Sequence, residues 1–292
     1  MTGILCLDKP AEMTSFACCA VARRLLGEKK IGHAGTLDPM ATGVLPLLVG
    51  KATRALDFLP SHDKEYVATL RFGLTSDTLD IWGNVTETGK PLPTIDAVTA
   101  VLPAFTGEIR QVPPMMSALK KNGVRLYDLA RQGIEVERES RPVTVYRLEL
   151  LADNTAHGEI TLRCACSKGT YIRTLCDDIG RALGCGAVMT ALRRTKAVGF
   201  STEDCLTPEE ARAAAENGTL TDRLLSVDRV LSVYPALTVT DAQARRFSNG
   251  GALDLQRLRD AVTGLTRVYH PDGSFIGLGI PENESLAIAK LF

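Results

Sequence analysis

Alternation of apolar and polar residues in the middle of the chain constrains the fold most strongly. Segments 65–72, 143–151 and 159–167 alternate with a period of two, which is typical of strands with one buried face. In the first segment four residues share a face: Tyr66, Ala68, Leu70 and Phe72. In the third segment another four do so: Ile160, Leu162, Cys164 and Cys166. Segments 143–151 and 159–167 are predicted to pair as antiparallel partners.

Helical segments lie between the strands without a regular strand–helix–strand rhythm. Thr14 or Ser15 caps a predicted helix that ends at Gly27. Asn122-Gly123 marks a hairpin turn behind a strand at 117–120. Further helices are expected over 51–59 (ending at Pro60), 97–102, 171–183 and 207–216, and strands over 3–7 and 44–49. The pattern predicts an α+β fold with a mixed, largely antiparallel sheet.

A second, smaller domain is expected at the C-terminal end. Near Tyr234-Pro235 the pattern restarts with short strands and a helix around 242–247. Glycine-rich turns are predicted at 249–251 and 277–279. We therefore expect two domains, 1–232 and 233–292, in a chain of 292 residues that is longer than the usual single domain.

Composition excludes some classes of protein and leaves others open. The 34 basic and 34 acidic residues cancel, so the net charge gives no indication of a polyanionic partner. Two basic clusters, 23–33 and 193–196, border candidate site segments, which favours phosphate contacts over an ordinary solvated surface. No apolar run approaches the ~18 residues of a membrane-spanning helix, and no basic region precedes an apolar stretch at the start. We expect a soluble, cytoplasmic protein.

The eight cysteines include no Cys-x-x-Cys pair that could begin a zinc site. Cys6, Cys164 and Cys166 lie in apolar strand patterns, where a reduced thiol behaves as a small apolar side chain. We expect reduced, buried cysteines and no metal.

One acidic side chain stands out in the nearly uncharged run GHAGTLDPMATGVLP at 32–46. Asp38 precedes Pro39, which favours an extended backbone at Asp38. Gly35 and Gly43 allow positive φ or a close approach of another backbone. A plain Asp-Pro turn is the usual explanation of such a dipeptide. A rigid loop that presents one carboxylate suits a nucleophile or a base, and the whole run favours that interpretation.

This run resembles the nucleophile loop of the TruB family, the tRNA pseudouridine-55 synthases that isomerise one uridine of the T-loop. Four further segments resemble that family in the same order: 3–10 (GILCLDKP), 64–66 (KEY), 112–127 (VPPMMSALKKNGVRLY) and 166–173 (CSKGTYIR). The resemblance implies a catalytic domain of pseudouridine synthase type. It also implies a small C-terminal PUA-like β domain that binds RNA.

The resemblance also implies roles for seven residues. Asp38 is the expected nucleophile or stabiliser, and Arg173 is the electrostatic partner that favours its charged form. Tyr66 is expected to stack on the uracil, and its phenol could serve in proton removal from C5. His33 is expected to fill the space that a flipped nucleotide leaves. Three further residues are expected to line the base pocket or its wall: Tyr171, Leu192 and Lys9.

The local sequence offers Arg173 a different partner. In the first turn of a helix over 171–183 a cation opposes the helix dipole unless a carboxylate offsets it. Asp38 would supply that carboxylate. Asp177 and Asp178, four and five residues on, are the alternative partners, and the residues alone leave the two possibilities open.

Isomerisation of uridine breaks the bond from ribose C1′ to N1 and joins C1′ to C5. It needs no cofactor, and the sequence contains neither a P-loop nor a Gly-x-Gly-x-x-Gly motif. We expect tRNA, through its T-stem-loop, as the partner of a monomeric enzyme. Two alternatives are a tRNA-binding or folding module without catalysis, and a carboxylate-dependent glycosidase. The second is disfavoured because the matched segments place an arginine beside Asp38, where a retaining glycosidase has a second acid.

Overall fold

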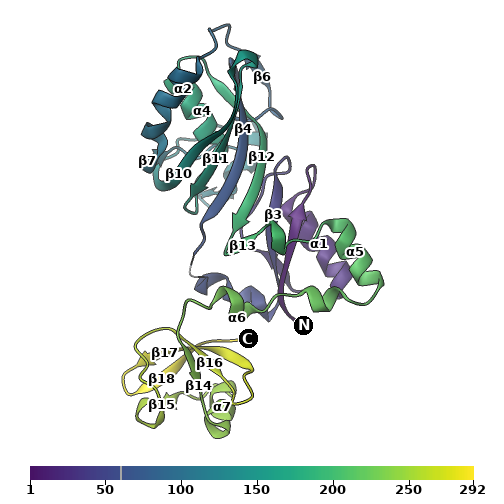
Figure 1. The fold of residues 1–292 in the computed structure, drawn as a ribbon, viewed down its shortest axis with the longest axis vertical. Helices are drawn as coiled ribbons and strands as arrows, with labels where there is room; N and C mark the ends of the chain where they lie inside the picture. Colours follow the sequence, from purple (N-terminus) through teal and green to yellow (C-terminus); the bar gives the residue numbers. More distant parts are fainter. Residues whose placement is uncertain (60) are drawn as a thin grey trace.

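The computed structural model describes residues 1–59 and 61–292, so Pro60, the predicted end of helix 51–59, lies outside the described part. Nine strands form one mixed sheet in the upper and middle parts of the molecule (Figure 1). Its strands are β1 (Thr2–Lys9), β2 (Ile31–His33), β3 (Thr42–Gly50), β4 (Lys64–Phe72), β7 (Gly107–Gln111), β10 (Arg141–Asn154), β11 (Glu159–Cys166), β12 (Ala187–Ala197) and β13 (Phe200–Ser201). The main order is β1-β3-β12-β4-β11-β10-β7, with β2 beside β3 and β13 beside β12.

A narrow parallel seam joins the two halves of this sheet. Strands β3 and β12 pair in parallel at Thr42 with Arg193 and at Gly43 with Arg194. The other strand pairs described in this sheet are antiparallel, as predicted. Gly43 has a φ of +102°, and a Cβ at this position would collide with the carbonyl oxygen of Arg194. Only glycine fits here, because it tolerates this φ and has no side chain.

The alternating segments have the predicted faces. Strand β4 buries Tyr66, Ala68, Leu70 and Phe72, and β10 and β11 are antiparallel neighbours. Helices α2 (Ile95–Val101) and α4 (Ile172–Ala182) cover one face of this half of the sheet (Figure 1). Their apolar residues form one core with the buried residues of β4 and β11. This core supports the first turn of α4, which carries Arg173.

Two helices pack beside β1 and β3 in the other half. The first, α1 (Ser15–Leu26), is capped by Thr14 and ends at Gly27 with a φ of +64°, as predicted. The second, α5 (Pro208–Glu216), begins with a capping box in which Thr207 and Glu210 bond each other's backbone N–H. These local signals require no tertiary information, which explains why the sequence predicts both helices correctly.

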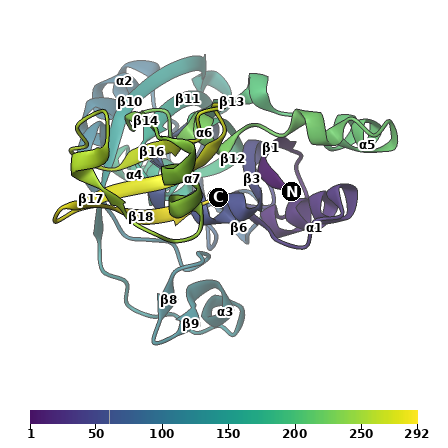
Figure 2. The ribbon, with the colours of Figure 1, turned by 90° about the horizontal axis from the view of Figure 1, so that it is seen from below.

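Two hairpins extend beyond the sheet. One consists of β5 (Leu74–Ser76) and β6 (Val85–Glu87). The other, β8 (Lys120–Lys121) and β9 (Val124–Arg125), is followed by α3 (Leu126–Arg131) and projects away from the body (Figure 2). The predicted turn at Asn122-Gly123 is present. The strand predicted over 117–120 is wrong, because pairing begins only at Lys120.

The C-terminal part contains a second, five-stranded sheet with its own apolar core. Its elements are β14 (Ala236–Thr238), α7 (Asp241–Ser248), β15 (Leu253–Asp254), β16 (Thr266–Tyr269), β17 (Phe275–Glu282) and β18 (Ser285–Leu291). Phe275 and Leu278 also share a core with Val227 and Val230, which lie on α6 (Val227–Val230). Because apolar residues from both sides of 232/233 pack together, the domain boundary stays a prediction.

Two predicted elements differ in kind. Segment 277–279 is not a turn but lies within β17, where Gly277 is needed because a Cβ would collide with the carbonyl oxygen of Lys290. Segment 51–59 forms a 3₁₀ helix, η1 (Lys51–Phe58). Other 3₁₀ turns are η2 (Leu102–Phe105), η3 (Thr155–His157), η4 (Thr202–Asp204), η5 (Leu220–Arg223) and η6 (Leu255–Arg257). None of the helices in the described ranges is both long and apolar enough to span a membrane.

Candidate active site

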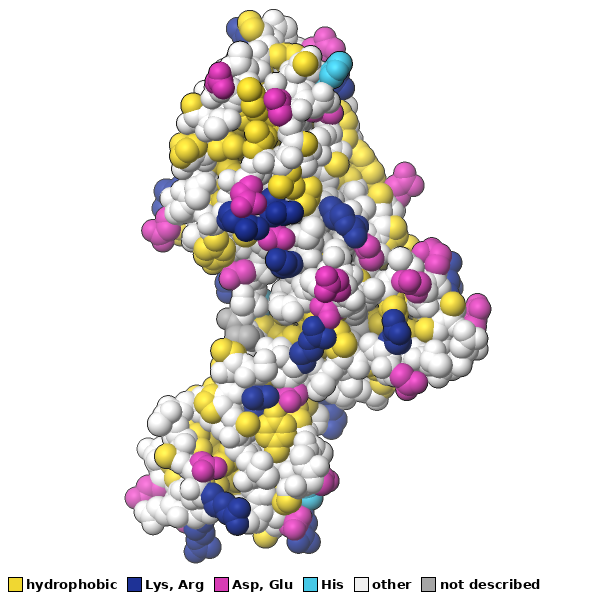
Figure 3. All heavy atoms as spheres, viewed as in Figure 1, with side chains coloured by type: hydrophobic (Ala, Val, Ile, Leu, Met, Phe, Trp, Pro, Cys, Tyr) yellow, Lys and Arg dark blue, Asp and Glu magenta, His cyan; other side chains and the backbone are white. Residues whose placement is uncertain are grey.

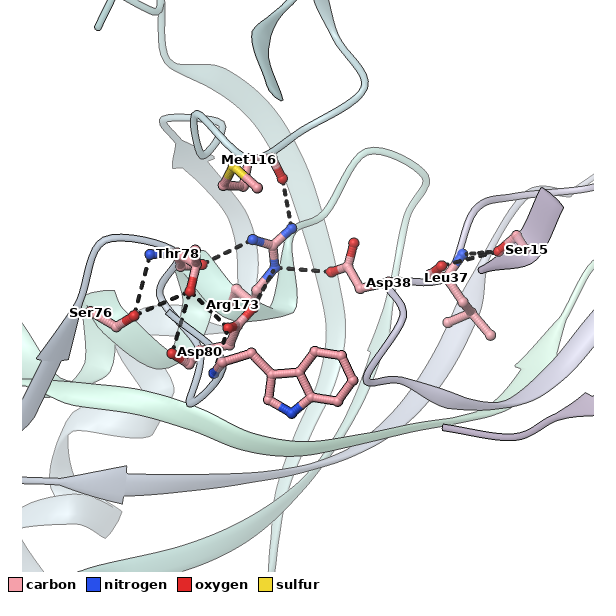
Figure 4. Close-up of polar contacts among 9 residues, drawn as sticks. Ser15, Leu37, Asp38, Ser76, Thr78, Asp80, Met116 and Arg173 are labelled. Carbon is pink, nitrogen blue, oxygen red and sulfur yellow. Dashed lines mark hydrogen bonds and ion pairs between the residues drawn. The ribbon is translucent and has the colours of Figure 1, made fainter. Parts of the chain in front are cut away.

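Asp38 and Arg173 form an ion pair in which Arg173 Nε lies 2.9 Å from Asp38 Oδ2 (Figure 4). Asp38 belongs to the loop between β2 and β3, and Arg173 belongs to the first turn of α4. The arginine side chain is 6% exposed, whereas the aspartate side chain is 37% exposed. The guanidinium therefore lies buried behind a carboxylate that a ligand can reach from solvent.

The remaining donors of Arg173 bind two backbone carbonyls. Nη1 donates to Thr78 O at 2.9 Å, and Nη2 donates to Met116 O at 2.8 Å (Figure 4). Thr78 lies in the loop between β5 and β6, and Met116 lies in the segment before β8. These contacts fix the guanidinium plane and direct Nε toward Asp38. A lysine ammonium has no comparable planar set of donors.

A second carboxylate that the sequence analysis missed faces the same arginine. Asp80 is buried, and its Oδ2 lies 3.7 Å from Arg173 Nε. Its Oδ1 accepts hydrogen bonds from Thr78 Oγ1 at 2.7 Å and from the Trp82 N–H at 3.0 Å. In the sequence, an aspartate in a short polar turn looks like an ordinary turn residue. Only the fold brings it beside Arg173.

The local alternative for Arg173 is not formed. Asp177 is bound instead by Arg181, whose Nη2 lies 2.8 Å from Asp177 Oδ2. Asp38 and Asp80 therefore supply the negative charge that offsets a buried cation at the N-terminal end of α4.

The backbone of the Asp38 loop is fixed from the side of α1. Ser15 Oγ accepts a hydrogen bond from the Leu37 N–H at 2.8 Å and donates one to Leu37 O at 3.0 Å (Figure 4). Ser15 is buried, so both polar groups of the residue before Asp38 are satisfied without water. The carboxylate direction is therefore set by the fold.

A second buried arginine holds the backbone before and after Asp38. Arg194 is fully buried, and its donors reach three carbonyl oxygens: Val44 O at 2.8 Å, Gly35 O at 3.1 Å and Thr36 O at 3.4 Å. The predicted phosphate contact is therefore wrong for Arg194, which faces the interior. Its neighbour Arg193 binds Asp8 at 2.7 Å. In Figure 3 basic and acidic side chains are intermixed on the visible face.

Lys9, expected near the pocket wall, is also fully buried. Its Nζ donates to Pro39 O at 3.1 Å and to Pro10 O at 2.7 Å. Burial lowers the pKa of this ammonium group. Lys9 thus supports the loop from behind and does not line an open surface.

Tyr66 is buried in the same apolar cluster as Leu37 and Leu192. Burial raises the pKa of the Tyr66 phenol to about 12, against the lowering effect of the Arg194 guanidinium. The phenol is therefore protonated at neutral pH. Leu192 lies on β12 opposite Ala68 of β4, and its side chain belongs to this cluster. Its role in a base pocket stays a prediction.

His33 and Tyr171 complete the predicted set. His33 is half-buried on β2, and its Nδ1 has no hydrogen-bond partner among the described residues. Burial, together with the Arg194 charge, lowers the pKa of the imidazole, so the ring is neutral at pH 7. Tyr171 is the N-cap residue of α4.

Gln111 was also missed by the sequence analysis. This buried side chain accepts from the Tyr171 N–H at 3.0 Å and donates to Tyr171 O at 3.3 Å. It therefore fixes the backbone two residues before Arg173. Its effect depends on a long-range contact that no local pattern shows.

All eight cysteines are free, and seven of them are buried. Within 1–59 and 61–292, no three or more His, Cys, Asp and Glu side chains gather as metal ligands would. The expected absence of a metal stays a prediction.

Family models and relatives both match the chain closely. Residues 23–172 match the N-terminal domain of TruB family pseudouridylate synthase, residues 173–232 a tRNA pseudouridylate synthase B C-terminal domain, and residues 235–291 the C-terminal region of pseudouridine synthase II TruB. The tRNA pseudouridine synthase B of Dechloromonas aromatica is 46% identical, covering 99% of this chain and 94% of the relative. The protein of the same name from Clostridium kluyveri is 41% identical over the full length of both chains.

A solved structure has the same fold. A chain in the crystal structure of a Cbf5-Nop10-Gar1 complex is 26% identical, with a TM-score of 0.74 over 99% of this chain and 84% of that one. The likeness extends over both sheets. The predicted α+β class with a small C-terminal PUA-like β domain is confirmed.

Proposed function

This chain belongs to the TruB family of pseudouridine synthases, and we propose that it isomerises one uridine in the T-loop of tRNA, at position 55, to pseudouridine. The observation that carries the proposal is the ion pair between Asp38 and Arg173, with 2.9 Å between Nε and Oδ2. Its carboxylate is accessible, whereas its guanidinium is buried and fixed by two carbonyls. This geometry suits an anionic group that must act on an incoming nucleoside.

The reaction needs no net addition or removal of atoms. The bond from C1′ to N1 breaks, the uracil turns, C1′ bonds to C5, the C5 proton leaves and N1 gains a proton. Asp38, paired with the Arg173 guanidinium, stabilises the electron-poor intermediate. The geometry is compatible with attack at ribose C1′, attack at base C6, or assistance of glycal formation.

The target base must leave its stack before Asp38 can reach it, which costs a few kcal/mol. In our proposal Tyr66 stacks on the extruded uracil, and Leu192 and Tyr171 line its pocket. His33 fills the vacated space, and a neutral imidazole suits this role because it carries no charge into an apolar gap. The enzyme works as a cytoplasmic monomer without metal or redox cofactor, and the C-terminal β domain adds RNA contacts.

The test is tritium release from tRNA labelled at uridine C5, measured for wild type and for Asp38→Asn. We expect wild type to release tritium from an unmodified tRNA transcript without a guide RNA. The variant keeps the size of the side chain and loses its charge, so its turnover is expected to fall by at least about 1000-fold. Its Kd for tRNA should stay within about tenfold of wild type.

Other outcomes separate the alternatives. Tight tRNA binding by wild type without tritium release would favour a non-catalytic binding or folding module. Release of free uracil would favour a glycosidase. Full turnover by Asp38→Asn would exclude Asp38 as the reacting group.

A further inference from the structure

We propose that Trp82, the only tryptophan of the chain, is a stacking platform for a nucleobase of the RNA substrate at the edge of the active site. The inference rests on the proposed function, since it assumes an RNA substrate. It adds a binding residue that neither the sequence motifs nor the ion pair identifies.

The backbone of Trp82 is bound to Asp80, the second carboxylate beside Arg173. Its backbone N–H donates to Asp80 Oδ1 at 3.0 Å, and Asp80 Oδ2 lies 3.7 Å from Arg173 Nε. Arg173 Nε is in turn 2.9 Å from Asp38. The indole thus lies two residues after Asp80, one of the two carboxylates beside Arg173.

The loop that carries Trp82 is held at several points. Ile81 N–H donates to Met189 O at 3.0 Å, and Met189 N–H donates to Leu79 O at 3.2 Å, so the loop pairs with β12. Gly83 is packed so tightly that a Cβ would collide with Thr78 Oγ1. A residue on such a loop loses little backbone freedom when a ligand binds to its side chain.

The Trp82 side chain is exposed to solvent. Trp82 is 55% exposed. Among the described residues, no aromatic ring stacks on the indole and no cation lies over it. Phe16 offers a contrast, because it is 68% exposed but Arg23 lies over its ring at 5.3 Å. Moving an exposed indole from water onto a flat partner is favourable, and an indole carried by a fixed loop beside a site is suited to such stacking.

A nucleobase is the partner that fits. Stacking of a base on an aromatic side chain is largely independent of base identity, because every base has a π-face. Base extrusion also exposes the faces of neighbouring bases that had been stacked on the target. Trp82 therefore contributes affinity for the RNA conformation with an extruded base, with little preference for sequence.

The single tryptophan allows a direct test by fluorescence. Asp38→Asn protein is titrated with a T-stem-loop RNA at constant salt, and indole emission is recorded with and without acrylamide as a collisional quencher. We expect the emission to be quenched to saturation with the Kd measured by filter binding, and acrylamide access to fall in the complex. Unchanged emission and unchanged acrylamide access at saturating RNA would overturn the proposal.

Kinetics provide the second arm. Trp82→Ala removes the ring but keeps the N–H bond to Asp80, so KM for tRNA is expected to rise roughly 5- to 100-fold while kcat changes less than about threefold. Trp82→Phe should restore most of the loss. Tyr146→Ala is the matched control, because Tyr146 is 54% exposed on β10 and bonds Asp63, outside the Asp38–Arg173 cluster. We expect wild-type kinetics for it.

The outcomes distinguish this proposal from the proposed function. If wild type releases tritium but Trp82→Ala has an unchanged KM, only the stacking role fails. A loss confined to kcat would also contradict stacking, because it would place the effect on Asp80. If wild type neither binds tRNA nor releases tritium, the proposed function fails first.

Discussion

Two buried arginines hold the Asp38 loop, but they bind different groups. Arg173 lies beside carboxylates, with Asp38 at 2.9 Å and Asp80 at 3.7 Å. Arg194 makes hydrogen bonds to the carbonyls of Gly35, Thr36 and Val44. The first arrangement acts on the charge of the loop, and the second acts on its backbone. The comparison separates a group that serves the chemistry from one that serves the position of the loop.

Burial alone does not reveal this difference. A buried cation without a carboxylate is costly unless all its donors are satisfied, and carbonyl oxygens satisfy Arg194. Arg173 could in principle be satisfied in the same way. Its pairing with an accessible acid is therefore the feature that marks it as functional.

Among the variants that compare the two arginines, Arg173→Lys is expected to have the largest effect. Lysine keeps the charge but cannot bind Asp38, Thr78 O and Met116 O together, so Asp38 loses its fixed partner. We expect kcat/KM for tRNA to fall roughly 100- to 1000-fold. The free energy of unfolding should change by less than the corresponding loss of transition-state stabilisation. Arg181→Lys on the same helix is the control. Equal losses of kcat/KM in both variants would contradict a specific role for Arg173.

Arg194→Met tests the second of these arginines. Removing the guanidinium leaves three carbonyls without their donor, so the free energy of unfolding is expected to fall by about 3 kcal/mol. The adjacent Arg193→Met breaks a partly exposed pair with Asp8 and should cost less than about 1 kcal/mol. Urea denaturation measures both values. A smaller effect at Arg194 than at Arg193 would refute its supporting role.

Tyr66 lies close enough to Arg194 to be affected by its charge, and the raised pKa of its phenol gives a pH prediction. With the pKa of the phenol raised to about 12, its phenolate form is scarce at neutral pH. Single-turnover rates measured from pH 7 to 9 are expected to change less than about threefold. A reaction that used the preformed phenolate would accelerate about tenfold per pH unit in this range. Such a rise would show that Tyr66 acts as a base in its ionised form.

The smallest effect is expected at Asp178, a half-buried carboxylate on α4. Burial and the Asp177 charge raise the pKa of Asp178 to about 6. A raised carboxyl pKa means that the folded state favours the protonated acid, so ionisation destabilises the fold as pH rises through 4 to 6. Asp178→Asn should therefore stabilise the protein by roughly 1 kcal/mol at pH 8 and by nothing measurable at pH 4. Thermal unfolding at the two pH values would detect a reversed or absent difference.

Local signals in the sequence predict much of the fold. Thr14 and Gly27 define α1 by themselves, and alternation defines the buried face of β4 that carries Tyr66. The segments that resemble a known family also contain both members of the Asp38–Arg173 pair. These features depend on residues that are close in sequence or on recognised motifs.

The rest depends on contacts between distant segments. Asp80, Gln111 and Arg194 are polar residues in unremarkable local contexts, and each acquires its partners from segments far along the chain. Gly277 looked like a turn residue because the sequence does not show which strand passes over it. The predicted phosphate contact is wrong for Arg194, because a cluster of basic residues in the sequence does not reveal which side chain points inward.

The seam at Gly43 sets a limit for protein engineering. Because no side chain fits between Gly43 and Arg194, a substitution at this position would separate β3 from β12 and displace the Asp38 loop. Mutant libraries that aim at new RNA targets should instead vary exposed positions such as Trp82, and should leave Thr78, Asp80 and Gly83 unchanged. The fold would then keep its reactive centre while its selectivity for RNA is changed.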